Sequence, residues 1–503
     1  MRTSHRTRIA RRAAAVLLAA GIVATWSATT PDPRLAAEAQ PAAAPPNIVF
    51  VLTDDLAWNL VPYMPQVQQL QADGATFTNY TVTDSLCCPS RSSLLTGKFP
   101  HDTGVFTNGG TDGGFAVFKG RGNEEHTFAT ALQAQGYATG FLGKYLNGYQ
   151  PADTQGGTQP YVPPGWSDWH VAGNGYPEYN YDLNENHSVV HYGSDPADYL
   201  TNVLARKGKT FIQRSVAAGQ PFLLEIATFA PHGPFTPADQ DLDDFPGLTA
   251  PRTPAYNKLP TGAPSWLAAN TPLTDTEKTT LDTNFRKRAQ AVQAVDRLIG
   301  NVRAQLETSG VAGNTYFVFS SDNGFHMGEY RLTGGKQTAF DTDVRVPLVV
   351  TGPGVPAGST RPEIVQNIDL APTFQRIGGA TVASDVDGRS LLGLAQGADA
   401  PNWRTGSLIE HHGPDQLADD PDLQTVRNGK PTTYAALRTA TYTYVEYATG
   451  DREYYDRVAD PYQLTNLAGQ LSAARLAQLH DALTAYQACH THEGCWTAGH
   501  VPA

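Results

Sequence analysis

The chain has 503 residues and a formal net charge of −12, with 48 acidic against 36 basic side chains. Residues 1–39 hold six arginines against Asp32 and Glu38, so the remainder carries −16. An acidic surface repels long polyanions, and the chain has no Lys/Arg run that would override this repulsion, so we predict no nucleic-acid partner. The length after residue 46 allows one large domain and one smaller domain.

The N-terminus has the pattern of an export signal. Arginines precede an apolar run from about Ala13 to Ala24, which is too short to span a bilayer. We interpret residues 1–39 as a signal peptide, cleaved between positions 28 and 39, together with the start of a linker, and residues 40–46 as the Pro/Ala linker. An uncleaved amphiphilic tail is the alternative. Arg11 and Arg12 match a twin-arginine signal only weakly, so we favour Sec export to the extracellular space, without a membrane span.

Helices and strands alternate along the next part of the chain. Apolar β-rich runs follow helical patterns, and the first such run, 47–53, ends in two acidic residues. The expected helices cover about 64–74, 126–136, 198–216 and 274–308, and the expected strands cover 47–53, 137–142, 221–229 and 314–321. Cys87 and Cys88 are expected to lie in a loop, followed by a helix that starts within 91–98. This order predicts an α/β fold with a doubly wound, parallel or mixed sheet between helical layers.

The pattern changes beyond about Gly379. Four short alternating runs, 407–412, 434–439, 442–447 and 452–456, predict antiparallel strands, and 471–486 predicts an amphipathic helix. We therefore predict a catalytic domain at 47–385 and a smaller α+β subdomain at 386–503. The irregular segments 147–191 and 233–271 are expected to be long loops that wall a pocket.

Polar residues follow the predicted strands. Asp54, Asp55, Asp322 and Asn323 offer only hard oxygen donors, which suit Ca²⁺, with Mg²⁺ as the alternative. Asp54 and Asp55 would share an ion only where the strand has ended and the backbone turns. The competing interpretation is that both motifs are ordinary polar turns.

Four cations accompany these acids in the sequence: Arg91, Lys144, His232 and Lys336. Each is an ordinary loop residue when taken alone. Converging beside a metal ion, they would neutralise a compact sulfate or phosphate ester before a nucleophile attacks. The chain shows no Ser-His-Asp or Cys-His pattern for that nucleophile, and a thiolate is not an obvious attacker of sulfuryl groups.

The stretch around Cys87 carries a family resemblance. "CCPSRSSLLTG" resembles the signature of type I, formylglycine-dependent sulfatases, and further similar stretches follow in family order along nearly the whole chain. They include "FVLTDDL", "GKYLNGY", "TFAPHGPF", "SSDNGFHMGEYRL", "DTDVRVPLVVTGPGV" and "YYDRVADPYQLTNLA". The motifs "CCPSR", "GKYLN", "FRKR" and "YQACHTHEGCW" are most similar to those of N-acetylglucosamine-6-sulfatases and extracellular heparan sulfatases.

The resemblance implies an alkaline-phosphatase-like fold and a mechanism. A formylglycine-generating enzyme would convert Cys87 to formylglycine, whose hydrate attacks sulfur and later expels sulfate, while Cys88 stays a buried, unpaired thiol. By this resemblance, the metal ligands would be Asp54, Asp55, Asp322, Asn323 and modified Cys87. Arg91 would hold the diol, and Lys144 and Lys336 would bind sulfate oxygens. His232, with Lys336, would act at the leaving oxygen.

The sequence departs from the family at one catalytic position. Many sulfatases carry a histidine two residues after the lysine of the "GK" motif as the base of the elimination step, but Leu146 stands there in this chain. Asn147 follows it, as in the glucosamine-6-sulfatase-like group. His326 and His101 are the remaining candidates for the base or for substrate binding.

The last two cysteines, Cys489 and Cys495, flank "HTHEG". A zinc site is one interpretation of these residues, and a small disulfide loop in an exported tail is the favoured one. Paired cysteines with this spacing in the resembling group support the disulfide.

The predicted function is a secreted sulfatase acting on a small sulfated sugar, of the 6-O-sulfate kind, or on an aryl ester. The alternatives are a phosphate mono- or diester hydrolase of the same superfamily and an inactive binding protein with unconverted Cys87. The acidic charge favours a terminal residue or a small ester over long heparan chains. The sequence leaves the natural substrate, its regiochemistry and the oligomeric state open.

Overall fold

A computed structural model describes residues 44–414, 417–418 and 420–503. The predicted signal peptide, 1–39, and most of the predicted linker lie outside the described residues. Residues 45–503 form one compact unit, and the proposed boundary near residue 385 stays a prediction. Within the described part of the chain, no helix combines the length and apolarity needed to cross a membrane.

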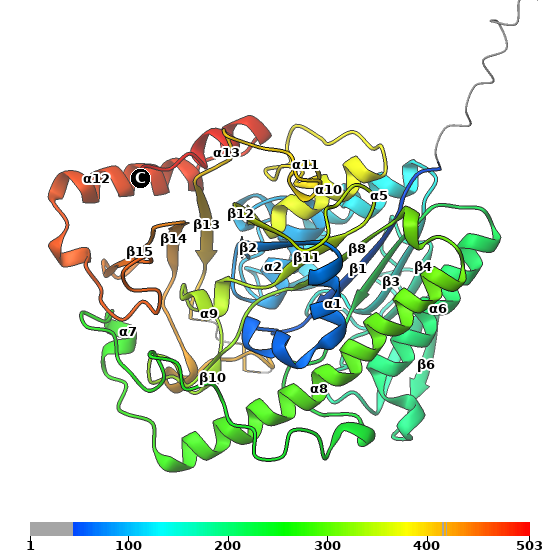
Figure 1. Ribbon diagram of the computed structural model, residues 1–503, viewed down its shortest axis with the longest axis horizontal. Coiled ribbons are helices and arrows are strands. Elements are labelled where there is room, and N and C mark those ends of the chain that lie inside the picture. Colours follow the sequence, from blue (N-terminus) through cyan, green and yellow to red (C-terminus); the bar gives the residue numbers. More distant parts are fainter. Residues whose placement is uncertain (1–43, 415–416, 419) are drawn as a thin grey trace, which may run out of the picture. The chain divides into compact units, whose positions relative to one another are not determined.

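The centre of this unit is a mixed sheet of ten strands (Figure 1), in the order β12-β2-β11-β8-β1-β7-β3-β4-β5-β6. Its strands are β1 (Asn47–Thr53), β2 (Ala75–Thr81), β3 (Ala138–Lys144), β4 (Asp168–Ala172), β5 (Tyr181–Glu185), β6 (Ser188–Tyr192), β7 (Phe222–Ala227), β8 (Thr315–Ser321), β11 (Leu348–Thr351) and β12 (Ser359–Gln366). The central strands β8, β1, β7, β3 and β4 run parallel. β11, β5 and β6 pair antiparallel with their neighbours.

Helices cover both faces of this sheet, which explains why the central strands are apolar throughout. The larger helices are α1 (Pro65–Asp73), α2 (Cys87–Thr96), α5 (Phe128–Ala134), α6 (Leu200–Ala217), α8 (Asp275–Thr308) and α10 (Leu370–Ile377). α1, α6 and α8 share one core with Val49 and Val51 of β1, while α2, α5 and α10 share the other with Phe50 and Leu52. Thr274 and Glu277 form a capping box, which explains why α8 begins next to the predicted start at residue 274.

The C-terminal part forms a separate antiparallel sheet of four strands, β13 (Gly406–His411), β14 (Tyr434–Thr439), β15 (Tyr442–Tyr447) and β16 (Arg452–Asp456). α12 (Ala473–Gln487) and α13 (His492–Ala498) follow it, and Leu479 and Leu483 of α12 pack on this sheet. The predicted fold class, a helix-flanked α/β sheet with a smaller C-terminal α+β part, is confirmed.

Short elements complete the fold: α3 (Pro100–Thr103), α4 (Gly114–Gly120), α7 (Ser265–Ala268), α9 (Asp341–Val344), α11 (Leu392–Ala395) and the two-stranded β9 (His326–Met327) and β10 (Gly334–Gly335).

Two local expectations were wrong. Residues 147–191 are not one irregular loop, because β4, β5 and β6 lie in this segment and extend the sheet at one edge. Cys87 and Cys88 do not lie in a loop before a helix, because α2 begins at Cys87 itself. Gly97, with a φ of 75°, ends that helix in the left-handed conformation that glycine adopts without strain.

Candidate active site

The candidate residues gather at the carboxyl ends of four neighbouring parallel strands. Asp54 and Asp55 follow β1, Lys144 ends β3, His232 follows β7, and Asp322 follows β8. This edge is where ligands bind in doubly wound sheets, as the sequence predicted. All of these side chains are buried.

Two backbone features bring the acids and the lysine together. Asp55 has a φ of 63°, so the chain turns directly after β1, as the sequence argument required for two adjacent aspartates to serve one site. Gly143 precedes Lys144 where the backbones of β3 and β7 approach closely, and a Cβ there would lie 1.9 Å from the carbonyl oxygen of Ala227. Lys144 Nζ then donates to Asp54 Oδ2 over 2.6 Å.

Cys87 lies at the first turn of α2, with its sulfur pointing into this group. Its Sγ is 3.2 Å from Asp54 Oδ1, 2.9 Å from Lys336 Nζ and 3.5 Å from Asp422 Oδ2. Burial, and then the nearby carboxylates of Asp322, Asp422 and Asp54, raise the pKa of this thiol well above its ordinary value of 9.0. The unmodified side chain is therefore a neutral thiol and a poor nucleophile.

Cys88 differs from its neighbour. It is a buried, free cysteine, as expected, and its backbone N–H donates to Asn108 Oδ1 over 3.0 Å. Burial raises the pKa of its thiol to about 12. Its sulfur therefore has the character of a small apolar packing group.

Arg91 and Lys336 fix two of the acids. Arg91 Nε donates to Asp322 Oδ2 over 2.8 Å, and its Nη1 donates to the carbonyl of Lys144 over 2.7 Å. Its Nη2 is buried, makes no hydrogen bond and lies 3.9 Å from Asp54 Oδ1. Lys336 Nζ donates to Asp55 Oδ1 over 2.6 Å. The free Nη2 is a donor available to an oxygen at position 87.

Both ring nitrogens of His232 face oxygen acceptors. Nδ1 is 2.8 Å from the carbonyl of Gly233, and Nε2 is 2.8 Å from Asp422 Oδ1. Burial lowers the pKa of this imidazole, but Asp55, Asp422 and Asp54 raise it more, to about 9. His232 is therefore a cation and a proton donor at neutral pH.

Asp422 is the site residue that sequence reasoning missed. Its carboxylate lies 2.8 Å from His232 Nε2 and 2.9 Å from Lys336 Nζ, and it accepts a 2.9 Å hydrogen bond from Asn108 Nδ2. It lies well beyond the end of β13, in a segment that does not directly follow a predicted strand and carries no motif, so only the folded chain shows its place. With it, four carboxylates, Asp54, Asp55, Asp322 and Asp422, form ion pairs with Arg91, Lys144, His232 and Lys336. A fifth buried cation, Arg288, donates to the backbone carbonyl of Asp55 and forms no ion pair with a described residue.

The oxygen donors fit a hard divalent cation. Ligand atoms of Asp54, Asp55, Cys87 and His232 lie within 4.8 Å of one another. Asn323 donates through Nδ2 to Asp55 Oδ1 over 2.7 Å, and its Oδ1 is buried without a hydrogen-bond partner. An unpaired buried amide oxygen beside three carboxylates has the chemistry of a Ca²⁺ ligand.

The three further candidates differ in their surroundings. Asn147 lies near the cluster, with Nδ2 3.4 Å from the hydroxyl of Tyr176 and Oδ1 buried without a partner. His326 is buried between Asp343 and the carbonyl of Asn428, so both of its nitrogens face acceptors. His101 contacts Glu410 and the carbonyl of Cys489 instead of the cluster. Neither histidine presents a free nitrogen as a base.

A cavity of about 540 Å³ opens beside the cluster. Its lining combines polar and apolar surface: Asn108, Gly109, Gly110, Asn147, Gly148, Gln150, Gly173, Asn174, Tyr176, Leu417, Asp420 and Pro421. The ring of Tyr176 lies 4.8 Å from Lys144 Nζ and 4.6 Å from the ring of His232. Asn108, Asn147 and Tyr176 therefore connect the cavity to the charged cluster.

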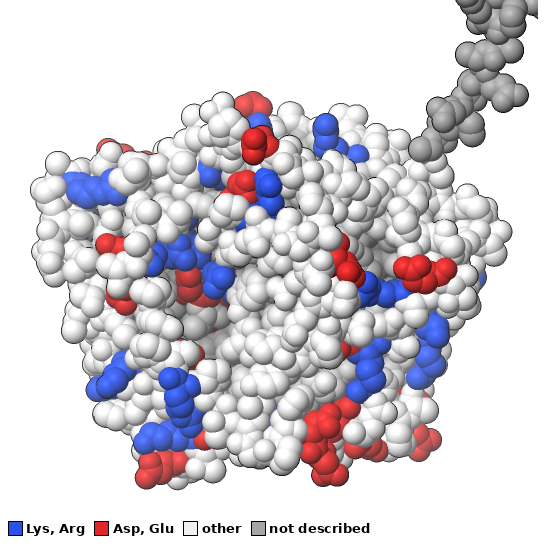
Figure 2. Space-filling model, in the orientation of Figure 1, with Lys and Arg blue, Asp and Glu red and all other residues white. Residues whose placement is uncertain are grey.

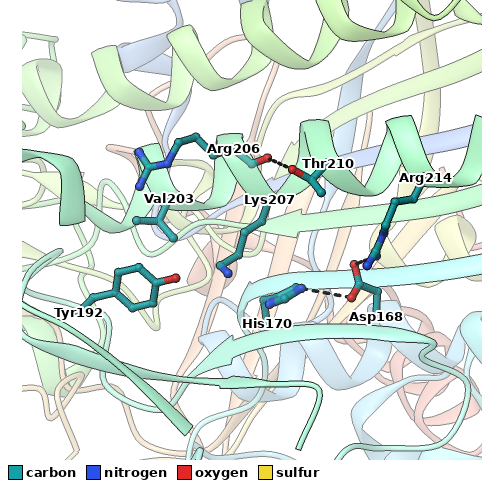
Figure 3. Close-up of a pocket in the computed structure, with 8 residues that line it drawn as sticks. All are labelled: Asp168, His170, Tyr192, Val203, Arg206, Lys207, Thr210 and Arg214. Atoms are coloured by element: carbon teal, nitrogen blue, oxygen red, sulfur yellow. Dashed lines mark hydrogen bonds and ion pairs between the residues drawn. The ribbon is translucent and has the colours of Figure 1, made fainter. Parts of the chain in front are cut away.

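Another cavity, of about 290 Å³, lies between α6 and the β4–β6 edge (Figure 3). Arg214 points toward Asp168 and pairs with it at 2.5 Å (Figure 3). Lys207 pairs with Glu185 at 2.7 Å. Asp168 is aligned with Gly140 of β3, whereas Ala172, at the other end of β4, is aligned with Lys144. This cavity therefore lies toward the opposite end of the strands from the cluster.

The sequence matches known protein families over most of its length. The sulfatase family profile matches residues 46–380, and the profile of the N-sulphoglucosamine sulphohydrolase C-terminal region matches residues 328–488. The chain is 36% identical to human N-acetylglucosamine-6-sulfatase, over 88% of this chain and 85% of that protein. It is 37% identical to the extracellular sulfatase SULF-1 homolog of Drosophila melanogaster, over 74% of this chain and 34% of that protein. The arylsulfatase of Volvox carteri is 30% identical, over 88% of this chain and 75% of that protein.

Solved structures share the fold. A protein in complex with its substrate D-glucosamine-2-N,6-O-disulfate superposes with a TM-score of 0.72 at 23% identity, covering 88% of this chain and 98% of that one. The phosphonate monoester hydrolase of Agrobacterium radiobacter superposes with a TM-score of 0.67 at 19% identity, covering 88% of this chain and 96% of that one. These matches along the sequence show that the chain, with its buried cluster of acids and cations around Cys87, belongs to the sulfatase family of sulfuric ester hydrolases.

Proposed function

We propose that this sulfatase is a secreted enzyme that hydrolyses sulfate esters of small sugars through a formylglycine made from Cys87. The observation that carries the proposal is the position of the Cys87 sulfur, buried within 3.2 Å of both Asp54 and Lys336 at the end of the central strands. A neutral thiol has no evident use there, whereas an oxygen nucleophile at the same position would touch a metal ligand and a cation.

The chain's own residues prepare the attack. Formylglycine supplies a hydrated aldehyde as the nucleophile, and Ca²⁺, held by Asp54, Asp55, Asp322, Asn323 and modified Cys87, supplies charge that polarises oxygen ligands. Arg91 Nη2 is free to hold a hydroxyl at position 87. Lys144 and Lys336 neutralise sulfate oxygens, and the protonated His232 gives its proton to the leaving oxygen.

The charge balance favours an anionic substrate. The described cluster holds four carboxylates and, with Arg288, five cations, so a bound divalent ion adds to a positive excess. A sulfate ester carries one negative charge and enters a site with the opposite sign. Asp422 occupies hydrogen-bond donors of His232 and Lys336 that a sulfate group would use, so substrate binding would shift this carboxylate.

The cavity beside the cluster, whose lining is both polar and apolar, supports a sugar as the alcohol part. Asn108, Asn147 and Gln150 offer amides to hydroxyl groups, and Tyr176 offers an aromatic face. The relatives named for N-acetylglucosamine-6-sulfatase activity support a 6-O-sulfate at a terminal residue. An aryl sulfate is the second candidate, since arylsulfatases also align over most of the chain.

The competing function is hydrolysis of phosphate or phosphonate esters, because phosphonate monoester hydrolases share the fold. The test compares kcat/KM on 4-nitrophenyl sulfate, 4-nitrophenyl phosphate and N-acetylglucosamine-6-sulfate in one preparation. We expect the sulfate esters to be preferred. A strong preference for the phosphoryl ester would reject the proposal, and no turnover of any ester by protein with unmodified Cys87 would favour an inactive binding protein.

A further inference from the structure

A second group of imidazoles and carboxylates lies where the C-terminal loop meets the catalytic part. We call it the tail cluster, and it consists of His101, Asp102, Asp387, Glu410 and His490. These residues come from α3, from the loop before α11, from β13 and from the loop after α12. They lie next to the disulfide between Cys489 and Cys495, which the structure contains as predicted.

The nitrogens and oxygens of this cluster face one another. His101 Nδ1 is 2.7 Å from Glu410 Oε2, and its Nε2 is 2.7 Å from the carbonyl of Cys489 and 3.8 Å from Asp102 Oδ2. His490 Nδ1 is 2.5 Å from Asp102 Oδ1. One ligand atom from each of His101, Asp102 and His490 lies within 4.8 Å of the other two.

The acids of the tail cluster have only histidines as ion-pair partners among the described residues: His101 pairs with Glu410 and Asp102, and His490 pairs with Asp102. Burial lowers the pKa of His101, but Glu410, the carbonyl of Cys489 and Asp102 raise it more, to about 9. Asp102 Oδ2 is buried and makes no hydrogen bond. Burial, and then the charge of Asp102, raise the pKa of Asp387 to about 8, which is the behaviour of two carboxylates held close together. No lysine or arginine among residues 44–414, 417–418 and 420–503 forms an ion pair with Asp102, Asp387 or Glu410.

We propose that His101, Asp102 and His490 bind a divalent transition-metal ion, with Zn²⁺ as the best chemical fit, and that this ion fastens the C-terminal disulfide loop to α3. Imidazole nitrogens together with a carboxylate suit Zn²⁺, whereas Ca²⁺ and Mg²⁺ prefer sets of oxygens only. His101 Nε2 faces the carbonyl of Cys489 at 2.7 Å as a hydrogen-bond donor, so metal binding requires this nitrogen to release its proton and the carbonyl to give way. The ion would replace the protons on the two coordinating nitrogens, which pass to solvent.

Glu410 has a separate part in this site. A zinc-binding histidine usually donates its other ring N–H to a carboxylate, which fixes the tautomer and the ring orientation. Glu410 accepts at His101 Nδ1, so it directs Nε2 of the same ring toward Asp102 and Cys489. Both cysteines of "CHTHEGC" are committed to the disulfide, so the zinc chemistry of this segment comes from His490 and not from sulfur.

The experiment uses the mature protein saturated with Ca²⁺, so that the catalytic cluster does not compete. Zn²⁺ is titrated by calorimetry, and thermal unfolding is recorded with and without Zn²⁺. We expect one Zn²⁺ per chain that excess Ca²⁺ does not displace, with a rise in Tm. His490→Ala, which changes a ring that is 62% exposed, should weaken this binding at least tenfold and abolish the rise in Tm.

His492→Ala is the matched control. It removes an imidazole from the same loop, but its Nδ1 faces the carbonyl of Val386, outside the three proposed ligands. We expect this variant to bind Zn²⁺ as the wild type does, and both variants to keep wild-type sulfatase activity in zinc-free buffer, which shows that they are folded. Equal Zn²⁺ affinity in His490→Ala, or no calcium-resistant Zn²⁺ binding by the wild type, would overturn the proposal. A visible Co²⁺ spectrum that survives in His490→Ala would also contradict it.

Discussion

At the scale of single residues, the site consists of ion-paired acids and cations around the uncharged thiol of Cys87. The thiol of Cys87 is surrounded by Asp54, Asp422 and Lys336, and its pKa is raised by burial and by nearby carboxylates. A thiolate would add one more negative charge to a buried group of acids. The proposed reaction therefore requires conversion of the Cys87 thiol side chain to one that offers an oxygen nucleophile.

Replacement of Cys87 should separate chemistry from folding. Cys87→Ala should lower kcat/KM for sulfate esters by on the order of 10³-fold or more, because it removes the nucleophile. Its Tm should stay close to that of the wild type, because the buried thiol makes no disulfide. Cys88→Ala is the neighbouring control and should keep most of the activity. Comparable activity in Cys87→Ala and Cys88→Ala would contradict the assignment.

The protonation of His232 predicts the alkaline side of the pH profile. Its pKa in the folded protein is about 9, above the ordinary 6.5, so the ring is protonated below pH 9 and loses its proton as the pH rises through that value. We expect kcat/KM to fall on the alkaline side of the profile as the proton donor is lost. With Ca²⁺ bound, the charge of Asp54 and Asp55 is offset, so the fall should begin below pH 9. Asp422→Asn removes one of the carboxylates that raise this pKa, so the fall should begin at a lower pH. A profile that Asp422→Asn leaves unchanged would contradict a role for His232 as the acid.

Most residues of the cluster could be predicted from the sequence, but Asp422 could not. Asp54, Lys144, His232 and Asp322 were found because each follows an apolar strand pattern, and strand ends meet at one edge. Asp422 reaches the same place from a segment without such a pattern, and its partners are more than 80 positions away in sequence. Only the folding of the C-terminal part brings it to His232 and Lys336.

At the scale of elements, the order of helices and strands was predictable where caps and apolar runs mark them. α8 was found within one residue of both ends because Thr274 and Glu277 form its cap and the apolar spacing persists to its end. The strands β4 to β6 were missed because Gly, Asn, Tyr and Asp interrupt the segment 147–191, and β6 is largely exposed. β4 pairs with β3, and Lys207 and Arg214 of α6 pair with Glu185 of β5 and Asp168 of β4, which a local pattern does not show.

Asp341 joins α9 to the C-terminal sheet and should be important for stability. Its carboxylate accepts from Arg438 Nε over 2.7 Å and from Arg457 Nη2 over 2.8 Å. Burial raises the pKa of this carboxyl, but the two arginines lower it more, to well below the ordinary 3.8. The stabilisation is therefore present at neutral pH and is lost as the pH falls below about 4.

Asp341→Asn should lower the free energy of unfolding at pH 7 by about 2–3 kcal/mol, because it leaves two buried or half-buried guanidinium groups without their acid. Denaturant unfolding at pH 7 and at about pH 2.5, well below the ordinary pKa, measures this difference, which should shrink at the lower pH. Asp275→Asn is the control, since Asp275 pairs with Lys278 in an exposed i,i+3 ion pair and should change stability by less than about 0.5 kcal/mol. An equal effect of both substitutions would contradict the argument.

At the scale of the whole molecule, charge and cavity together define the expected substrate. The part of the chain after residue 39 carries −16, and on the face shown in Figure 2 the basic side chains are scattered among acidic ones. The cavity beside the cluster has a volume of about 540 Å³, which suits a small sugar. A long polyanion would have to approach against the protein's overall charge.

The overall charge predicts how activity depends on chain length. N-acetylglucosamine-6-sulfate or a short terminal fragment should be hydrolysed with a higher kcat/KM than internal sulfates of long heparan chains. Raising the ionic strength should narrow this difference, because salt screens the repulsion between the acidic enzyme and the polyanion. Faster release of sulfate from internal positions of long chains at low salt would contradict a preference for terminal residues.

The measurement that tests the central claim most directly is the mass of the peptide that carries residue 87, taken from protein whose sulfatase activity has been measured. We predict the mass loss of a thiol-to-aldehyde conversion at Cys87, an unmodified thiol at Cys88, and specific activity in proportion to the converted fraction across preparations. Full activity in protein whose Cys87 is entirely an unmodified thiol would contradict the account.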